Sequence, residues 1–371
     1  MMSETAHALG TTRTQLLDVI HVAGLAPSLH NTQPWRFHVT PDRLELWADR
    51  SRQLHVADPD GRELRIACGA ALFNLRLALL GVGVRPLVSV VPDPDRPDLI
   101  AVVRRGGTRP ASPQVKELLR AVPLRRTNRR PFADAEVATS ARYELRRAAI
   151  EEGAWLDLVT DPDIRVELSG LAREAHDLQV SDPEFVAELD AWTGHVAERR
   201  DGVPARSGGP LPPPNSTWVF RDFTKGSGAT GRIYEAEPLI GVLSVHGDGP
   251  RQDVRAGEAL ERVLLTATVH GLAASFLSQL VEVPGARDRV RQLTSGTRPP
   301  QVVMRIGHGW PVAATPRRPL DEILVEDRPQ DRGSTERRSA ELDPDAAQPP
   351  GPQREHPRRG SAGPHPMQPT P

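Results

Sequence analysis

Hydrophobic residues recur every three or four positions along several stretches of the chain, and this spacing predicts amphipathic helices. The first covers residues 11–24, where Leu16 and Ile20 share one face and a threonine can cap the start. A longer helix begins after residues 58–61 and ends near Gly81, with a broad apolar stripe. The same spacing predicts further helices over residues 112–122, 140–152, 163–179, 253–270 and 284–293.

Between these helices, apolar and polar residues alternate in shorter runs that are typical of strands. Trp35, Phe37 and Val39 alternate with polar neighbours, and residues 41–43 turn the chain into a partner run over residues 44–47. This pattern predicts a β-hairpin. Further strands are predicted over residues 86–91, 99–104, 155–160, 238–245 and 301–306.

The two long helices resemble each other in sequence. The pattern G-x-A-L begins at Gly69 and again at Gly257, and Gly83 and Gly271 close the helices fourteen residues after these first glycines. One repeat of modest identity can arise by chance. Because the order of elements also restarts near residue 125, we interpret the chain as two copies of one α+β unit, residues 11–124 and 125–326.

Two regions interrupt the periodic pattern. Residues 202–214 are rich in Gly and Pro, which indicates a surface segment or a lid, and we place this lid insertion at about residues 192–223. Residues 327–371 contain almost no apolar residues and cannot offset the entropy of ordering, so a disordered tail is predicted. Its arginine pairs could bind an acidic partner, but the interspersed acids favour a solvated tail.

Composition excludes several classes of protein. The 371 residues are 38% hydrophobic and 26% charged, with a net charge of −1, so no global field attracts nucleic acid or a membrane surface. The single cysteine, Cys68, excludes an intrachain disulfide framework and is typical of a reducing, cytoplasmic location. The first ten residues lack the features of a secretory signal, and no apolar run has membrane-spanning length. The histidines show no metal-ligand spacing, so no metal is expected.

Candidate chemistry gathers in one loop, residues 26–34, between the first helix and the hairpin. Pro27 and Pro34 stiffen it, because proline fixes φ and restricts the residue before it. Side-chain amides carry both a donor and an acceptor, which suits a heterocyclic ring edge. A helix-to-strand turn that is merely rich in turn formers explains the same residues equally well. The candidate binding residues of this loop are the five polar residues Ser28, His30, Asn31, Thr32 and Gln33, together with Leu29.

The sequence Ala26-Pro27-Ser28-x-x-Asn31-x-Gln33-Pro34-Trp35-Arg36-Phe37 resembles the FMN-contacting loop of the nitroreductase family. Over residues 11–326 the chain is most similar to the single-chain, internally duplicated, actinobacterial branch called Acg-like. The resemblance implies an α+β nitroreductase-like fold in which two fused copies form an intrachain pseudo-dimer. It also implies two antiparallel-rich sheets flanked by helices, one FMN per chain between the two halves, and a monomer.

The family holds the FMN phosphate with arginines, which suit a dianion because of their planar fork. The segment Arg125-Arg126-Thr127-x-Arg129 resembles that motif. A solvated basic turn is the alternative. Residues 276–284 resemble a family segment near the flavin ring, although Leu280 stands where relatives carry proline. Residues 303–320 resemble the basic element near the end of the family fold. These elements contribute the weaker candidates Ser278 and Gln279 near the ring, and Arg317 and Arg318 near the phosphate.

The resemblance implies an FMN-dependent oxidoreductase that passes a hydride from NAD(P)H to a small-molecule acceptor such as a nitro compound or a quinone. The flavin supplies the chemistry, so no catalytic side chain is predicted. The alternative is a catalytically silent protein that sequesters or stores FMN beneath the lid. A nucleic-acid or scaffold role for the arginine-rich tail has little support.

Overall fold

The computed structural model describes residues 8–326 except 214, 215, 227, 230–233, 236 and 295. The predicted tail, residues 327–371, lies outside the described residues. Five strands form the first sheet, in the order β11-β1-β2-β4-β3, and all neighbours are antiparallel except β11, which runs parallel to β1. These strands are β1 (Trp35–Val39), β2 (Arg43–Ala48), β3 (Val84–Val90), β4 (Leu99–Thr108) and β11 (Leu324–Glu326).

A second sheet has four strands in the order β5-β8-β10-β9, all antiparallel. When β5 is matched to β1, and β8, β10 and β9 to β2, β4 and β3, the two sheets have the same strand order. The predicted α+β fold with two antiparallel-rich sheets is therefore confirmed, and the common order supports the predicted duplication. The strands are β5 (Ala154–Val159), β8 (Leu239–Val245), β9 (Ala273–Phe276) and β10 (Pro300–Gly307).

The predicted helices are all present, within three residues at each end. Thr12 caps the first of them through a capping box with Gln15, as its position suggested. The sequence patterns missed α6, β9, β11 and the short α8 and α10. The helices are α1 (Arg13–Gly24), α2 (Arg62–Gly81), α3 (Pro113–Ala121), α4 (Thr139–Glu151), α5 (Pro162–Val180), α6 (Pro183–Trp192), α7 (Pro250–Val269), α8 (Gln279–Glu282), α9 (Pro284–Leu293) and α10 (Leu320–Ile323).

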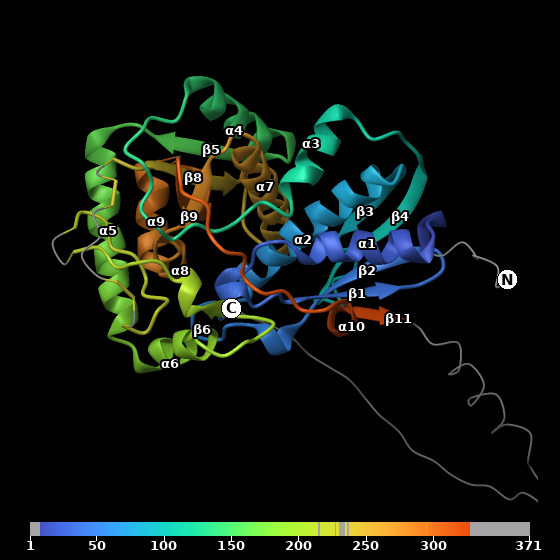
Figure 1. Ribbon diagram of the computed structural model, residues 1–371, viewed down its shortest axis with the longest axis horizontal. Coiled ribbons are helices and arrows are strands. Elements are labelled where there is room, and N and C mark those ends of the chain that lie inside the picture. The colour runs from blue at the N-terminus through green and yellow to red at the C-terminus, as the bar shows by residue number, and fades with distance from the viewer. Residues whose placement is uncertain are drawn as a thin grey trace, which may run out of the picture. The chain divides into compact units, whose positions relative to one another are not determined.

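The two long helices, α2 and α7, pack against each other between the two sheets (Figure 1). Their glycines permit this close approach. A Cβ at Gly69 would collide with the backbone carbonyl of Val254, and one at Gly257 would collide with that of Ile66. Gly257 lies 188 residues after Gly69, and Val254 lies 188 residues after Ile66, so the two contacts are pseudo-symmetric. α2 is long and apolar enough to cross a membrane, but most of it is buried in this contact and in the core.

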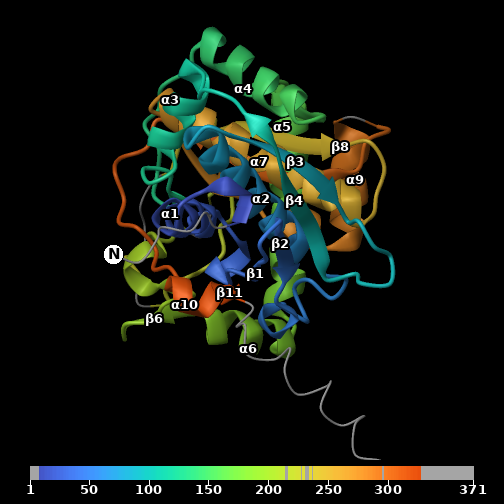
Figure 2. The same ribbon diagram turned by 90° about the vertical axis from the view of Figure 1, so that its right-hand side faces the viewer.

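The C-terminal arm of the second half returns to the first half. After β10, residues 308–319 lead to α10 and β11, which lie beside β1 (Figure 2). Ile323 of α10 belongs to the hydrophobic core of the first half. Residues that are far apart in sequence are thereby brought to the loop that precedes β1. Two short strands, β6 (Thr193–His195) and β7 (Val203–Pro204), lie in the predicted lid insertion.

Candidate functional site

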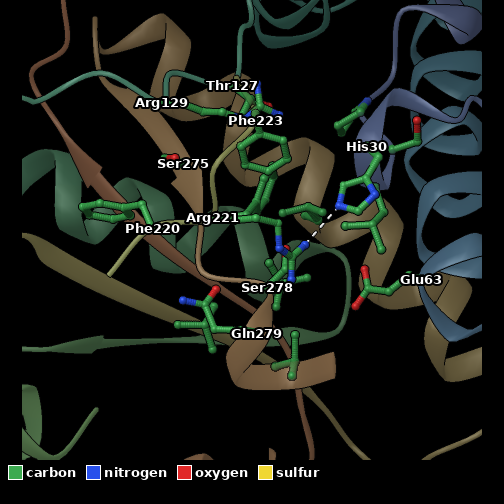
Figure 3. Close-up of a pocket in the computed structure, with 18 of the residues that line it drawn as sticks. His30, Glu63, Thr127, Arg129, Phe220, Arg221, Phe223, Ser275, Ser278 and Gln279 are labelled. Carbon is green, nitrogen blue, oxygen red and sulfur yellow. Dashed lines mark hydrogen bonds between the residues drawn. The ribbon is translucent and has the colours of Figure 1, made fainter. Parts of the chain in front are cut away.

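Two adjoining pockets lie where the two halves meet. The main pocket spans about 980 Å³, counting the solvent-filled space at its open side (Figure 3). The second, here called the arginine pocket, spans about 810 Å³, counted in the same way. Pro27, Ser28, Thr127 and Arg129 line both, so the two spaces adjoin along these residues.

The predicted site residues divide into three groups. The main pocket is lined by Ser28, Leu29, His30, Thr127, Arg129, Ser278 and Gln279. The arginine pocket is lined by Ser28, Asn31, Arg125, Arg126, Thr127, Arg129 and Arg317. Thr32, Gln33 and Arg318 line neither pocket.

The loop before β1 is held in an unusual backbone conformation. His30, Asn31 and Gln33 all have positive φ, between 48° and 58°. Such a conformation costs free energy in residues other than glycine, and it persists where the surroundings enforce it. Ser28 contributes by accepting a hydrogen bond at Oγ from the backbone N–H of Gln33, 2.9 Å away. The loop is therefore shaped by bonds within and around it.

The amides of Asn31 and Gln33, which the sequence led us to expect at a ring edge, bond protein groups in this structure. Asn31 Nδ2 donates to the carbonyls of Gly202 and Pro316, both at 3.0 Å, and its Oδ1 accepts from Arg317 at 2.9 Å. Gln33 Oε1 accepts from the backbone N–H of Arg318 at 2.8 Å. Both amides are satisfied by protein groups, so they fasten the lid segment and the C-terminal arm to the loop.

His30 is buried at 3% exposure and faces the main pocket. Arg221 donates a hydrogen bond of 3.0 Å to its Nε2 (Figure 3). Because arginine can only donate, the hydrogen of the neutral imidazole is on Nδ1, which has no partner. Burial, with Arg221 and Arg129 nearby, lowers the pKa of His30 well below its usual value. His30 is therefore neutral at pH 7 and presents a free N–H.

Sequence reasoning missed Arg221, which enters the pocket from the lid insertion. Its guanidinium bonds Glu282 at 2.6 Å, Gln179 at 2.8 Å and His30 at 3.0 Å. All four side chains are buried. The neighbouring Phe223 packs edge-on to the His30 ring, with 5.8 Å between ring centroids. The lid insertion thus closes over the loop, and the cluster of aromatic residues and arginine from 218 to 223 was its signal in the sequence.

The arginine pocket concentrates positive charge. Among the described residues, no carboxylate forms an ion pair with Arg126, Arg129 or Arg317, and Arg125 has only Glu261, at 3.6 Å. Loss of hydration and neighbouring arginines lower the pKa of Arg317 to about 9. The same causes lower the pKa of Arg129 to about 10. Guanidinium groups keep their proton, so these shifts indicate the electrostatic cost of holding the cluster together.

Arg318 has a structural role that the sequence did not indicate. It bonds the carbonyl of Gln33 at 3.1 Å and that of Glu322 at 2.8 Å, and it lies 3.8 Å from Asp49. It therefore joins the C-terminal arm to β1 and contributes no free group to either pocket. Its neighbour Arg317 bonds the carbonyls of Leu25 and Ala26 and keeps its Nε unpaired.

Three further pocket groups were missed. Glu63, in the first turn of α2, lines the main pocket with a side chain that is 13% exposed. Gln301, on β10, is fully buried and its Nε2 has no partner. Tyr234 lines the same pocket and donates its hydroxyl to the carbonyls of Arg129 and Pro210. None of these residues belongs to a recognisable sequence motif, because each is brought to the pocket by the fold.

Known proteins resemble this chain over most of its length. It is 32% identical over 311 residues to "Putative NAD(P)H nitroreductase acg" of Mycobacterium tuberculosis (strain ATCC 25618 / H37Rv), covering 82% of this chain and 93% of that protein. It is 34% identical over 318 residues to "Putative NAD(P)H nitroreductase Rv3131" of the same strain, covering 82% and 90%. The chain belongs to the Acg family of nitroreductase-like proteins.

No protein-family model matches the chain. Among solved structures, nitroreductase A from Vibrio parahaemolyticus resembles it at 14% identity with a TM-score of 0.36, covering 58% of this chain and 77% of that one. A TM-score below 0.5 carries no weight for the fold or the cofactor. Family membership rests on the mycobacterial relatives.

Proposed function

We propose that this protein binds one FMN per chain and uses NAD(P)H to reduce nitro or quinone-type acceptors. The observation that carries the proposal is the arginine pocket. Arg126, Arg129 and Arg317 hold three positive charges around one space without a carboxylate partner among the described residues. A buried or half-buried cation that lacks a counter-charge is costly, and an anionic ligand removes that cost.

The FMN phosphate fits this donor set. A phosphate monoester carries close to two negative charges and three acceptor oxygens. Among the described residues, Arg126 makes one hydrogen bond, to the Arg125 carbonyl, and the buried Nε–H of Arg317 has no partner. These groups, with Arg125 and Arg129, would hold the phosphate, and Asn31 would orient Arg317.

The main pocket fits the isoalloxazine ring. Its wall combines aromatic side chains, including Phe220, Phe223 and Phe276, with two buried N–H groups that lack partners, on His30 and Gln301. A flat heterocycle with apolar faces and a polar edge suits such a wall. When bound, FMN would supply hydride transfer between NAD(P)H and the acceptor. The relatives named as NAD(P)H nitroreductases support this assignment.

A specific observation favours the storage alternative as well. The lid insertion is fastened over the main pocket by Arg221, through Glu282 of α8 and His30 of the loop. Phe223 packs on His30 from the same segment. A lid held this way excludes water from a bound flavin. If it also excludes nicotinamide, the protein would sequester FMN without turnover.

One anaerobic experiment separates the two functions. The purified protein is saturated with FMN, NADH or NADPH is added, and the absorbance of oxidised flavin is followed. Bleaching within seconds, followed by recovery when a quinone is added, supports the oxidoreductase. Retention of colour with either nucleotide supports storage, and shortening residues 202–214 should then restore bleaching. Flavin extracted after saturation should be one per chain. Failure to bind FMN would contradict both functions.

A further inference from the structure

Reduction of either acceptor class consumes a proton as well as a hydride. A quinone that takes up one hydride and one proton becomes a hydroquinone. A nitro group that takes up one hydride and one proton becomes a nitroso group and releases water. NAD(P)H supplies the hydride, through the flavin of the proposed function, but it supplies no proton. An acid placed in the pocket can supply that proton more directly than bulk water can.

Glu63 is placed for this task. It lies in the first turn of α2, and its carboxylate lines the main pocket opposite Ser278 and Gln279 of the second half (Figure 3). One carboxylate oxygen pairs with Arg62, while the other has no hydrogen bond to any residue that the structure describes. Arg62 is itself held by the backbone and side-chain oxygens of Gln301 and by the carbonyl of Val281. The acid is thus fixed in position with one oxygen available.

The groups around Glu63 favour its protonated form. Burial is the largest cause, Arg62 opposes it, and the carboxylates of Asp58, Glu282 and Asp253 add to it. Together they raise the pKa of Glu63 to about 7. Two more charged or titratable groups also face the pocket, Arg221 from the lid and His30 from the loop, but they pair with each other. Glu63 therefore takes up a proton more readily near neutral pH than an exposed glutamate does.

The other titratable residues that line the described part of the pocket are poor proton donors. Burial raises the pKa of Tyr234 to about 12, and its hydroxyl is already donated to two carbonyls. The pKa of His30 lies far below 7, so it carries no spare proton at neutral pH. Arg129 and Arg221 retain their protons. Glu63 is the lining acid that can both give up a proton and regain one near pH 7.

We propose that Glu63 is the general acid that protonates the acceptor as the acceptor is reduced. This inference rests on the proposed function. The proton leaves the carboxyl group for the acceptor oxygen, and the carboxylate is re-protonated from solvent before the next turnover. Arg62, Asp58, Glu282 and Asp253 act as positioning residues, since they set its location and acidity without lining the reaction path.

The test compares Glu63→Gln with Glu63→Asp and with Asp60→Asn, an exposed acid at the same helix start. Each variant is first saturated with FMN and bleached anaerobically with NAD(P)H, and Asp60→Asn should match the wild type in both steps. Stopped-flow oxidation by a quinone at pH 7 should slow about 10²-fold in Glu63→Gln and partly recover in Glu63→Asp. The wild-type rate should also fall as pH rises through about 7, and this dependence should vanish in Glu63→Gln.

A second readout does not depend on turnover. The infrared carboxyl band of the flavin-free protein should lose intensity as pH rises through about 7, and Glu63→Gln should lack that change. If the band does not titrate there, or if Glu63→Gln is oxidised at the wild-type rate, Glu63 is not the acid. If the wild type binds no FMN or is not bleached by NAD(P)H, the proposed function fails instead, so the two failures are distinguishable.

Discussion

Two arginines near the junction of the halves, Arg305 and Arg317, differ in the charge of the groups that they contact. Arg305, on β10, is 1% exposed and pairs with Glu235, bonds the carbonyl of Arg130 at 2.7 Å and lies 3.9 Å from the Phe132 ring centroid. Arg317 is partly buried, and its hydrogen-bond acceptors in the described part of the chain are all neutral: Asn31 Oδ1, the Thr315 hydroxyl and backbone carbonyls. One arginine has its charge neutralised within the protein, and the other does not.

The difference distinguishes a structural cation from one arranged for a ligand. Neutral acceptors satisfy the hydrogen-bond geometry of a guanidinium, but they do not cancel its charge. The clamp, defined here as Arg125, Arg126, Arg129 and Arg317, holds four charges against the single carboxylate of Glu261 among the described residues. Arg305 needs nothing further. We propose that an anion completes the clamp, and the predictions below test this contrast.

The largest effect is expected for Arg126→Ala with Arg317→Ala. Charge-assisted hydrogen bonds contribute about 1.5–3 kcal/mol each, so losing two should weaken FMN binding by about 10²–10⁴-fold. The measurement is calorimetric or fluorescence titration of the flavin-free protein. Arg130→Ala is the matched control, because Arg130 belongs to the same segment but is exposed and lines neither pocket. Full FMN retention by the double variant, with its fold intact, would remove the clamp assignment.

Arg305→Met should act on stability instead. It leaves Glu235 buried without its counter-charge, and breaking a buried pair costs about 3–5 kcal/mol. Urea unfolding without flavin measures the loss. Arg305→Met with Glu235→Leu removes both charges and should recover most of it. If the single and double variants lose the same free energy of unfolding, the ion pair does not account for the stability that Arg305 contributes.

Asn31→Leu and Gln33→Leu separate two interpretations of the loop. If both amides held the flavin ring, both variants would weaken FMN binding. The contacts predict that Gln33→Leu leaves the backbone N–H of Arg318 unpaired and lowers the free energy of unfolding by about 1–3 kcal/mol, with FMN affinity unchanged. Asn31→Leu should lower both quantities, since it also releases Arg317. Equilibrium unfolding and FMN titration on the same samples give the answer.

The smallest effect is a pH dependence. His30 has a lowered pKa in the folded state, so the unfolded state binds the proton more readily. Its contribution to stability is complete above about pH 6.5 and is lost as pH falls below that value toward the folded pKa. Protonation would place a second cation against Arg221. His30→Gln should therefore flatten the fall in stability between about pH 7 and 5 in urea unfolding. An unchanged slope would show that His30 does not titrate there.

Much of this protein follows from local sequence. The threonine at position 12, the periodic apolar faces and the alternation at β1 specify elements without distant partners. The motif at residues 125–129 and the loop at 26–34 indicated the right regions for the two pockets, because both depend on residue types within one short segment. Gly69 and Gly257 marked the repeat in the sequence, but the contact that requires them to be glycine is visible only in the structure.

The exact roles within those regions required the tertiary structure. Arg221 meets His30 across 191 positions of sequence, and Arg317 meets Asn31 across 286. Whether an amide faces a ligand or a backbone carbonyl depends on such distant neighbours, so the ring contacts suggested for Asn31 and Gln33 could not be tested from the loop alone. In the sequence, Glu63 looks like an ordinary acidic residue in the first turn of a helix. Only burial beside three other carboxylates gives it a pKa near neutrality, because desolvation and charge depend on three-dimensional surroundings.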